Sequence, residues 1–163
     1  MMHTQRIPEK IFSRDELTRQ VNRWKLLGKK IVFTNGCFDI LHSGHLEVLS
    51  KAAEAGNILV VGLNSNESVS RLKGPHRPVN SEAFRTLMMA SLQIVDAVSV
   101  FTEDTPLELI SAILPDVLVK GGDYTPETIV GADLVTRHGG TVLVVPIVQG
   151  YSTTGIIERI RSL

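Results

Sequence analysis

The stretch Thr34-Asn35-Gly36-Cys37-Phe38-Asp39-Ile40-Leu41-His42-Ser43-Gly44-His45 decides the fold of this chain. It follows an apolar run at residues 31–33, which predicts a strand, and it precedes residues 46–53, whose spacing predicts a helix. Ligands bind at the carboxyl ends of strands in a parallel sheet, and the amino end of a helix attracts anions. The stretch therefore predicts an anion site at a strand-to-helix turn.

Four more apolar runs predict further strands, at residues 58–63, 97–101, 116–119 and 141–145. The run Ile58-Leu59-Val60-Val61 has little polar alternation, which is typical of a strand that is covered on both faces. Segments with helical spacing separate these runs. The alternation predicts an α/β fold, a Rossmann-like three-layer sandwich with a mostly parallel five-stranded sheet.

We expect a single domain over residues 1–163, in which residues 1–12 form a loose amino-terminal arm. Ser13 and Glu16 have the spacing of a capping box and predict the start of the first helix. Residues 81–93 predict a later helix. Its apolar face would carry Phe84, Leu87, Met88 and Leu92.

The charge of the chain argues against a general nucleic-acid binder, because 17 basic and 17 acidic residues leave no net charge. The distribution is uneven. Residues 1–30 carry eight basic and three acidic residues, a charge of +5, and the remainder carries nine and fourteen, a charge of −5. The basic start indicates either a solvated amphipathic helix or a surface for phosphates or a partner subunit.

The single cysteine, Cys37, excludes an intramolecular disulfide and favours a reducing compartment. No apolar run approaches the ~18 residues needed to span a bilayer. The first residues lack the apolar core of a signal peptide. These features predict a cytoplasmic protein that does not bind membranes.

His42 and His45 could both face one phosphate chain at the predicted anion site. With Asp39 nearby they could also suggest zinc. A zinc pair on a helix is usually four residues apart, however, and a structural zinc site needs four ligands. We therefore expect no protein-bound metal, and two surface histidines without a role remain the alternative.

Two segments of the chain resemble the signatures of the nucleotidylyltransferase superfamily. The segment from Asp39 to His45 resembles its His-x-Gly-His motif, and Gly150-Tyr151-Ser152-Thr153-Thr154-Gly155 resembles its Ser/Thr-rich turn before the last helix. The two motifs lie about 110 residues apart, and each is expected at a strand-to-helix turn. The resemblance implies a site for the triphosphate of a nucleotide.

The chain is more specifically similar to the adenylyltransferase domain of the ADP-heptose synthase family. The similar segments are Arg71-Leu72-Lys73-Gly74-Pro75, Arg77-Pro78-Val79-Asn80, Glu103-Asp104-Thr105-Pro106-Leu107 and the segment from Pro115 to Tyr124. The resemblance implies a stand-alone form of a domain that many bacteria fuse to a sugar kinase. It implies that ATP and D-glycero-β-D-manno-heptose 1-phosphate give ADP-heptose and pyrophosphate, for lipopolysaccharide inner-core synthesis.

This reaction needs no general base, because the sugar phosphate is already a nucleophile at neutral pH. Cys37 is therefore not expected to be a nucleophile, and the histidines are expected to donate to phosphate oxygens. The resemblance implies catalytic roles for His42, His45, Lys73 and Arg85. It implies nucleotide binding by Thr34, Asn35, Gly36, Cys37, Phe38, Gly44, Lys120, Gly121, Ser152, Thr153 and Thr154, and sugar-phosphate binding by Asp39, Arg77 and Asp123.

Two departures from the family pattern concern the substrate contacts. Asn66 stands where an aspartate is expected, and Ala83-Phe84 stand where an acidic or amide residue should precede Arg85. The alternatives are a cytidylyltransferase for glycerol 3-phosphate and a non-catalytic nucleotide-binding protein. Magnesium is expected with ATP, held mainly by phosphates and water, and a homodimer is expected from the family.

Overall fold

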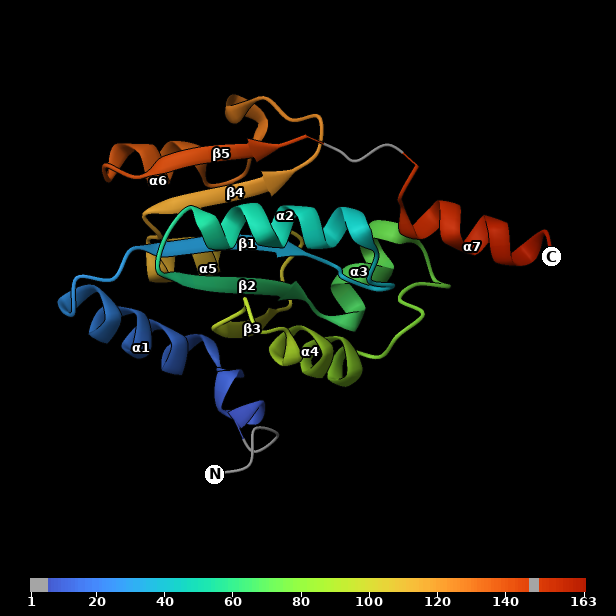
Figure 1. Cartoon of the computed structure of the whole chain (residues 1–163), viewed down its shortest axis with the longest axis horizontal. Coiled ribbons are helices and arrows are strands. Elements are labelled where there is room, and N and C mark those ends of the chain that lie inside the picture. Colours follow the sequence, from blue (N-terminus) through green and yellow to red (C-terminus); the bar gives the residue numbers. More distant parts are fainter. Residues whose placement is uncertain (1–5, 147–149) are drawn as a thin grey trace.

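The structure is a computed structural model, and it describes residues 6–146 and 150–163. It confirms the predicted fold, with a five-stranded sheet whose strands are all parallel (Figure 1). The sheet has the order β3-β2-β1-β4-β5. The strands are β1 (Ile31–Gly36), β2 (Ile58–Asn64), β3 (Ala97–Phe101), β4 (Val117–Gly121) and β5 (Thr141–Val145).

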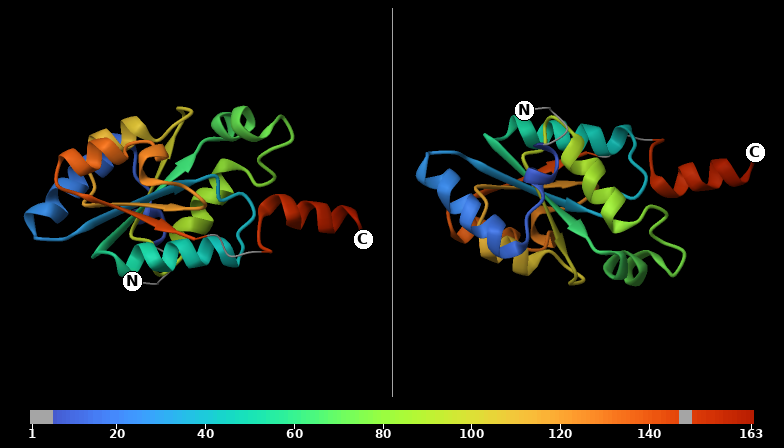
Figure 2. Two further views of the ribbon diagram at one scale, coloured as in Figure 1. Left: turned by 90° about the horizontal axis from the view of Figure 1, so that it is seen from above. Right: turned by 90° about the horizontal axis from the view of Figure 1, so that it is seen from below.

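Helices cover both faces of the sheet, which explains why its strands are apolar throughout. Helices α1 (Arg14–Leu26), α5 (Leu107–Ile113) and α6 (Ala132–Arg137) pack on one face, and α2 (Ser43–Glu54) and α4 (Glu82–Ser91) pack on the other. Figure 2 shows the sheet between these two layers. Side chains alternate along each strand, so Ile31 and Phe33 meet the first layer and Val32 meets the second.

The strand order fixes the place of the candidate site. The chain runs from β1 to β2 and β3, and then returns to the other side of β1 as β4 and β5. All carboxyl ends lie at one edge, and the order reverses between β1 and β4. Ligands of open α/β sheets bind at such a switch point. The loop between β1 and α2 begins there, and it leads to His42, just before α2, and to His45 in the first turn of α2.

Helix α4 presents a different face to the sheet from the one predicted. Phe84 and Leu87 are 53% and 46% exposed, whereas Arg85, Met89 and Ala90 are buried. The apolar spacing along α4 fits two neighbouring faces, so spacing alone could not choose between them. Burial of this face provides hydrogen-bond acceptors for the N–H groups of Arg85, because four oxygen atoms lie around its guanidinium.

The loose arm predicted for residues 1–12 is wrong for its second half. Residues Pro8–Lys10 form the 3₁₀ helix η2, and the Phe12 N–H donates to the Val98 carbonyl at 2.9 Å. Lys10 Nζ also donates to the carbonyls of Leu92 and Val95, at 3.1 and 2.7 Å. These bonds fix the segment against β3 and the end of α4, and residues 1–5 lie outside the described residues.

The predicted capping box at the start of α1 is confirmed. The Ser13 N–H donates to Glu16 Oε2 at 2.9 Å, and the Glu16 N–H donates to Ser13 Oγ. Two amide groups that the helix itself cannot satisfy are thereby paired. Across residues 6–146 and 150–163, none of the helices combines the length and the apolar character that crossing a membrane requires.

Candidate active site

A cavity of about 660 Å³ opens at the carboxyl edge of the sheet, over the end of β1. Its walls come from the β1–α2 loop, the end of helix α3 (Asn66–Lys73), the segment after β4 and the start of helix α7 (Thr153–Arg161). All of the predicted site residues line it except Arg85 and Asp123. The lining residues among them are Thr34, Asn35, Gly36, Cys37, Phe38, Asp39, His42, Gly44, His45, Lys73, Arg77, Lys120, Gly121, Ser152, Thr153 and Thr154.

The two signature segments meet in this cavity, although about 110 residues separate them. A Cβ atom placed on Gly44 would lie 3.7 Å from the Tyr151 carbonyl oxygen, and Thr153 Oγ1 donates to the Ile40 carbonyl at 3.4 Å. Ser152 Oγ caps α7 by accepting from the Gly155 N–H at 3.0 Å. The amino ends of α2 and α7 therefore face one ligand volume, and both favour anions.

The rings of His42 and His45 stack on each other, with centroids 3.7 Å apart and planes at 24°. Nδ1 of each ring is buried and has no hydrogen-bond partner within residues 6–146 and 150–163. An unpaired buried N–H costs more than an unpaired lone pair, so burial favours the tautomer with its proton on Nε2. Both rings line the cavity, and each can then donate one hydrogen bond to a ligand oxygen.

Both imidazoles are neutral at pH 7. Burial lowers the pKa of His42 below its ordinary value of 6.5. Burial and, secondarily, the charge of His42 lower the pKa of His45 to about 4. As neutral imidazoles, the two rings can offer N–H donors to an anionic ligand without carrying a positive charge of their own.

The lowered pKa of His45 predicts that acid destabilises the protein. The unfolded state binds more protons than the folded state between about pH 4 and 6.5, so the free energy of unfolding falls as pH decreases through this window. We expect urea unfolding at pH 5 and pH 7.5 to differ by on the order of 1 kcal/mol from this group, after allowing for solvent screening. The His45→Gln variant should show a smaller difference, and an equal difference would contradict the assignment.

Gly44 is required because the His42 ring lies against it. A Cβ atom at Gly44 would lie 3.1 Å from His42 Nδ1, so the ring would have to shift by a few tenths of an ångström. We expect Gly44→Ala to lower turnover about 10-fold with little change in melting temperature, since small misplacements of a catalytic group are costly. Steady-state kinetics would test this, with the exposed neighbour Ser43→Ala as control. Equal rates in the two variants would contradict it.

Lysine and arginine side chains supply positive charge on both sides of the histidine pair. Lys120 Nζ lies 3.3 Å from Asn35 Oδ1 and 5.7 Å from the centroid of the Tyr124 ring. Burial lowers the pKa of Lys120, and no carboxylate pairs with it in the described part of the chain. Lys73 and Arg77 line the cavity on the other side. The cavity is thus suited to a polyanion.

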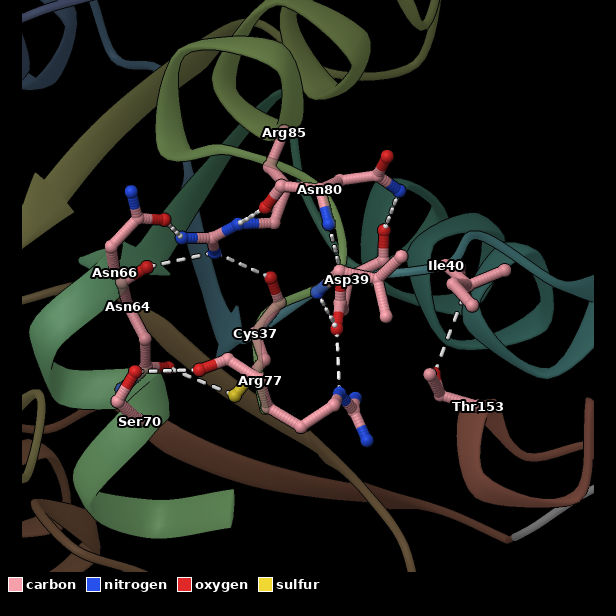
Figure 3. Close-up of polar contacts among 11 residues, drawn as sticks. Cys37, Asp39, Ile40, Asn64, Asn66, Ser70, Arg77, Asn80, Arg85 and Thr153 are labelled. Carbon is pink, nitrogen blue, oxygen red and sulfur yellow. Dashed lines mark hydrogen bonds and ion pairs between the residues drawn. The ribbon is translucent and has the colours of Figure 1, made fainter. Parts of the chain in front are cut away.

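Asp39 holds a loop, which differs from its predicted contact with the sugar phosphate. It is 1% exposed, and its carboxylate accepts from the N–H groups of Val79 and Asn80 at 2.8–2.9 Å and from Arg77 Nε at 2.7 Å. Burial would raise the pKa of Asp39, but these hydrogen bonds together lower it. With both oxygens engaged, Asp39 fixes the loop that carries Arg77 (Figure 3).

Arg85 does not line the cavity, so its position does not support the predicted direct contact with phosphates. It is 0% exposed, and its guanidinium donates to the carbonyls of Asn80, Cys37 and Asn64 at 2.7–3.1 Å. Figure 3 shows it between the β1–α2 loop, the end of β2 and the loop before α4. Arg85 is therefore a positioning residue for the segments that form the cavity.

The two departures from the family pattern are accommodated around Arg85. Asn66 Oδ1 accepts from Arg85 Nη2 at 3.1 Å, so an amide oxygen serves as the acceptor at this position. Glu82 Oε2, three residues before Arg85, accepts from the Asn66 N–H at 3.1 Å. Neither departure leaves Arg85 without an acceptor.

The structure places the predicted site residues Asp123 and Cys37 differently with respect to the cavity. Asp123 is exposed and does not line the cavity, so its predicted sugar contact has no support from its position. Burial raises the pKa of the Cys37 thiol, with nearby cations opposing the change, so the thiol is uncharged at pH 7.

Asp104 and Thr105 line the cavity without having been predicted. Their position directly after a strand was the available signal.

The described residues contain no group of three or more His, Cys, Asp or Glu side chains that could hold a metal ion.

The model for the family described as cytidylyltransferase-like matches residues 33–159 of this chain. The chain belongs to this family. The match begins within β1 and ends within α7, so it includes both signature segments and every element between them.

The chain is 57% identical over 145 residues to the bifunctional protein HldE of Hyphomonas neptunium, covering 89% of this chain and 30% of that protein. It spans about a third of the length of the curated relatives it matches. Among solved structures, a lipopolysaccharide core biosynthesis protein from Thermoplasma volcanium has a TM-score of 0.60 and 29% identity, covering 77% of this chain and 100% of that chain. Pantoate-beta-alanine ligase from Francisella tularensis, at 14% identity, shares the fold, with a TM-score of 0.61 over 94% of this chain and 78% of that one.

Proposed function

We propose that this protein is an enzyme that transfers the adenylyl group of ATP to D-glycero-β-D-manno-heptose 1-phosphate, giving ADP-heptose and pyrophosphate. One observation carries the transfer chemistry. Two neutral, stacked histidines at the amino end of α2 share a cavity with the hydroxyl-rich start of α7. This arrangement offers hydrogen-bond donors to a triphosphate from two directions.

The mechanism depends on positioning and charge stabilisation. The acceptor phosphate attacks the α-phosphorus, one of its oxygens forms the new P–O bond, and the bond to the β-phosphate oxygen breaks. His42 and His45 donate to the departing pyrophosphate, and Ser152 and Thr153 offer hydroxyl and backbone N–H groups to it. Lys73 and Lys120 offset the negative charge that collects on the phosphates.

The choice of a heptose rests on similarity. The chain resembles the ADP-heptose synthase family in the segments around Lys73, Asp104 and Lys120, and it matches the bifunctional protein HldE at 57% identity. The name of the Thermoplasma protein refers to lipopolysaccharide core biosynthesis, which agrees with this choice. The product would then serve the inner core of lipopolysaccharide.

Magnesium would arrive as the ATP complex, as part of the substrate. The carboxylate of Asp39 is fully engaged, and Asp104 is the other acidic residue at the cavity. Phosphate oxygens and water would therefore supply most ligands of the ion. A single domain, a homodimer and a cytoplasmic location remain predictions from the sequence.

The test measures pyrophosphate release with four substrate pairs, combining ATP or CTP with heptose 1-phosphate or glycerol 3-phosphate. We expect release with ATP and heptose 1-phosphate only. Equal or better activity with CTP and glycerol 3-phosphate would favour a cytidylyltransferase. ATP binding without any pyrophosphate from the four pairs would indicate a non-catalytic protein.

A further inference from the structure

The sheet order divides the cavity into two sides. The end of β1, with the histidine pair, lies in the middle. Lys120, near the end of β4, and Tyr124, after it, lie on one side, and Asp104 and Thr105 follow β3 on the other, close to the end of α3. The β3 side thus combines a carboxylate and a hydroxyl group with the cation of Lys73, which ends α3.

Asp104 is held in place by Arg71, in the last turn of α3. Arg71 Nε donates to Asp104 Oδ1 at 2.6 Å, and Arg71 Nη2 donates to the Thr102 carbonyl at 2.6 Å. One guanidinium therefore fixes both the carboxylate and the backbone of the segment after β3. The second carboxylate oxygen of Asp104 has no hydrogen-bond partner in the described part of the chain, and its side chain is 65% exposed.

The carboxylate and the hydroxyl group on the β3 side of the cavity suit the sugar part of the acceptor substrate. A carboxylate repels the phosphates of ATP, whereas it accepts hydrogen bonds from hydroxyl groups. The ion pair with Arg71 also reduces its repulsion of a phosphate near Lys73. The arrangement fits a molecule with an anionic end, held by Lys73 and Arg77, and a neutral polyhydroxylated body that extends toward Asp104.

We propose that Asp104 and Thr105 bind the hydroxyl groups of the acceptor sugar and thereby set the specificity for a sugar 1-phosphate over a short phosphorylated acceptor. Arg71 is a positioning residue that orients the Asp104 carboxylate. The proposal rests on the proposed function, because it identifies the acceptor side of that reaction.

Steady-state kinetics of Asp104→Asn test the proposal. We expect the KM for heptose 1-phosphate to rise about 10-fold or more, the range for losing a hydrogen bond to a charged group. The KM for ATP should stay within about twofold, because the proposal places Asp104 against the acceptor sugar and not against the nucleotide. Asp133→Asn is the matched control, since this exposed aspartate also pairs with an arginine but lies on α6, away from the cavity.

Arg71 variants separate positioning from general stability. Arg71→Ala should raise the KM for the sugar phosphate as Asp104→Asn does, and Arg71→Lys should restore part of it, with equal melting temperatures. An unchanged KM for the sugar phosphate in Asp104→Asn, or an equal rise for ATP, would overturn the proposal. A wild-type protein that releases no pyrophosphate would instead refute the proposed function, so the two failures are distinct.

Discussion

Replacing His45 with alanine is expected to lower turnover at saturating substrates by about 100-fold or more. Removing one preorganised donor to a developing charge typically costs 10²–10³ in rate, or about 2.7–4 kcal/mol. His45 is the more buried partner of the stacked pair and lies 5.1 Å from the Phe38 ring, centroid to centroid, so its position is fixed before substrate arrives. Pyrophosphate release under single-turnover conditions would measure the chemical step directly.

The control for this variant is His138→Ala, which removes an exposed histidine at the end of α6. Its turnover should match the wild type. ATP binding, measured by calorimetry, should weaken far less in His45→Ala than turnover does, because the ring acts mainly on the leaving group. A turnover within threefold of the wild type would refute the role of the histidine pair.

Replacing Arg85 with alanine is expected to destabilise the protein by about 3 kcal/mol or more. The change leaves three backbone carbonyls without their donor, those of Cys37, Asn64 and Asn80, and each unpaired buried group costs about 1–3 kcal/mol. Water entering the vacated space would recover part of this cost. Thermal unfolding should then show a midpoint lower by roughly 10 °C, at about 2–4 °C per kcal/mol for a chain of this size.

The Arg85→Lys variant separates the structural role from direct catalysis. Lysine keeps the charge but cannot reach all four acceptors, so stability should be intermediate and turnover should fall in parallel with stability. Arg137→Ala, an exposed arginine on α6, should leave the unfolding midpoint nearly unchanged. If Arg85→Lys kept full stability and lost turnover, Arg85 would contact substrate, as the sequence had suggested.

The location of the site could be predicted because its parts are local. A strand, a turn and a helix follow one another along the chain around His42 and His45, and the same holds around Ser152. Parallel strands bring their carboxyl ends to one edge, so each such turn points to the same region. The roles of Asp39 and Arg85 could not be predicted, because each depends on partners far along the chain. Asp39 accepts from Asn80, 41 residues away, and Arg85 donates to Cys37, 48 residues away.

The sequence by itself determined the alternating fold, the capping box of α1 and the residue types that surround the cavity, because each depends on neighbours along the chain. Tertiary structure alone decided which face of α4 is buried and that Arg85 bonds to backbone carbonyls. It also decided that Asp39 holds a loop and that Asp104 faces the cavity. A buried polar group takes whatever partners the assembled elements bring within hydrogen-bond distance, and those distances exist only once the sheet and its two helical layers have packed.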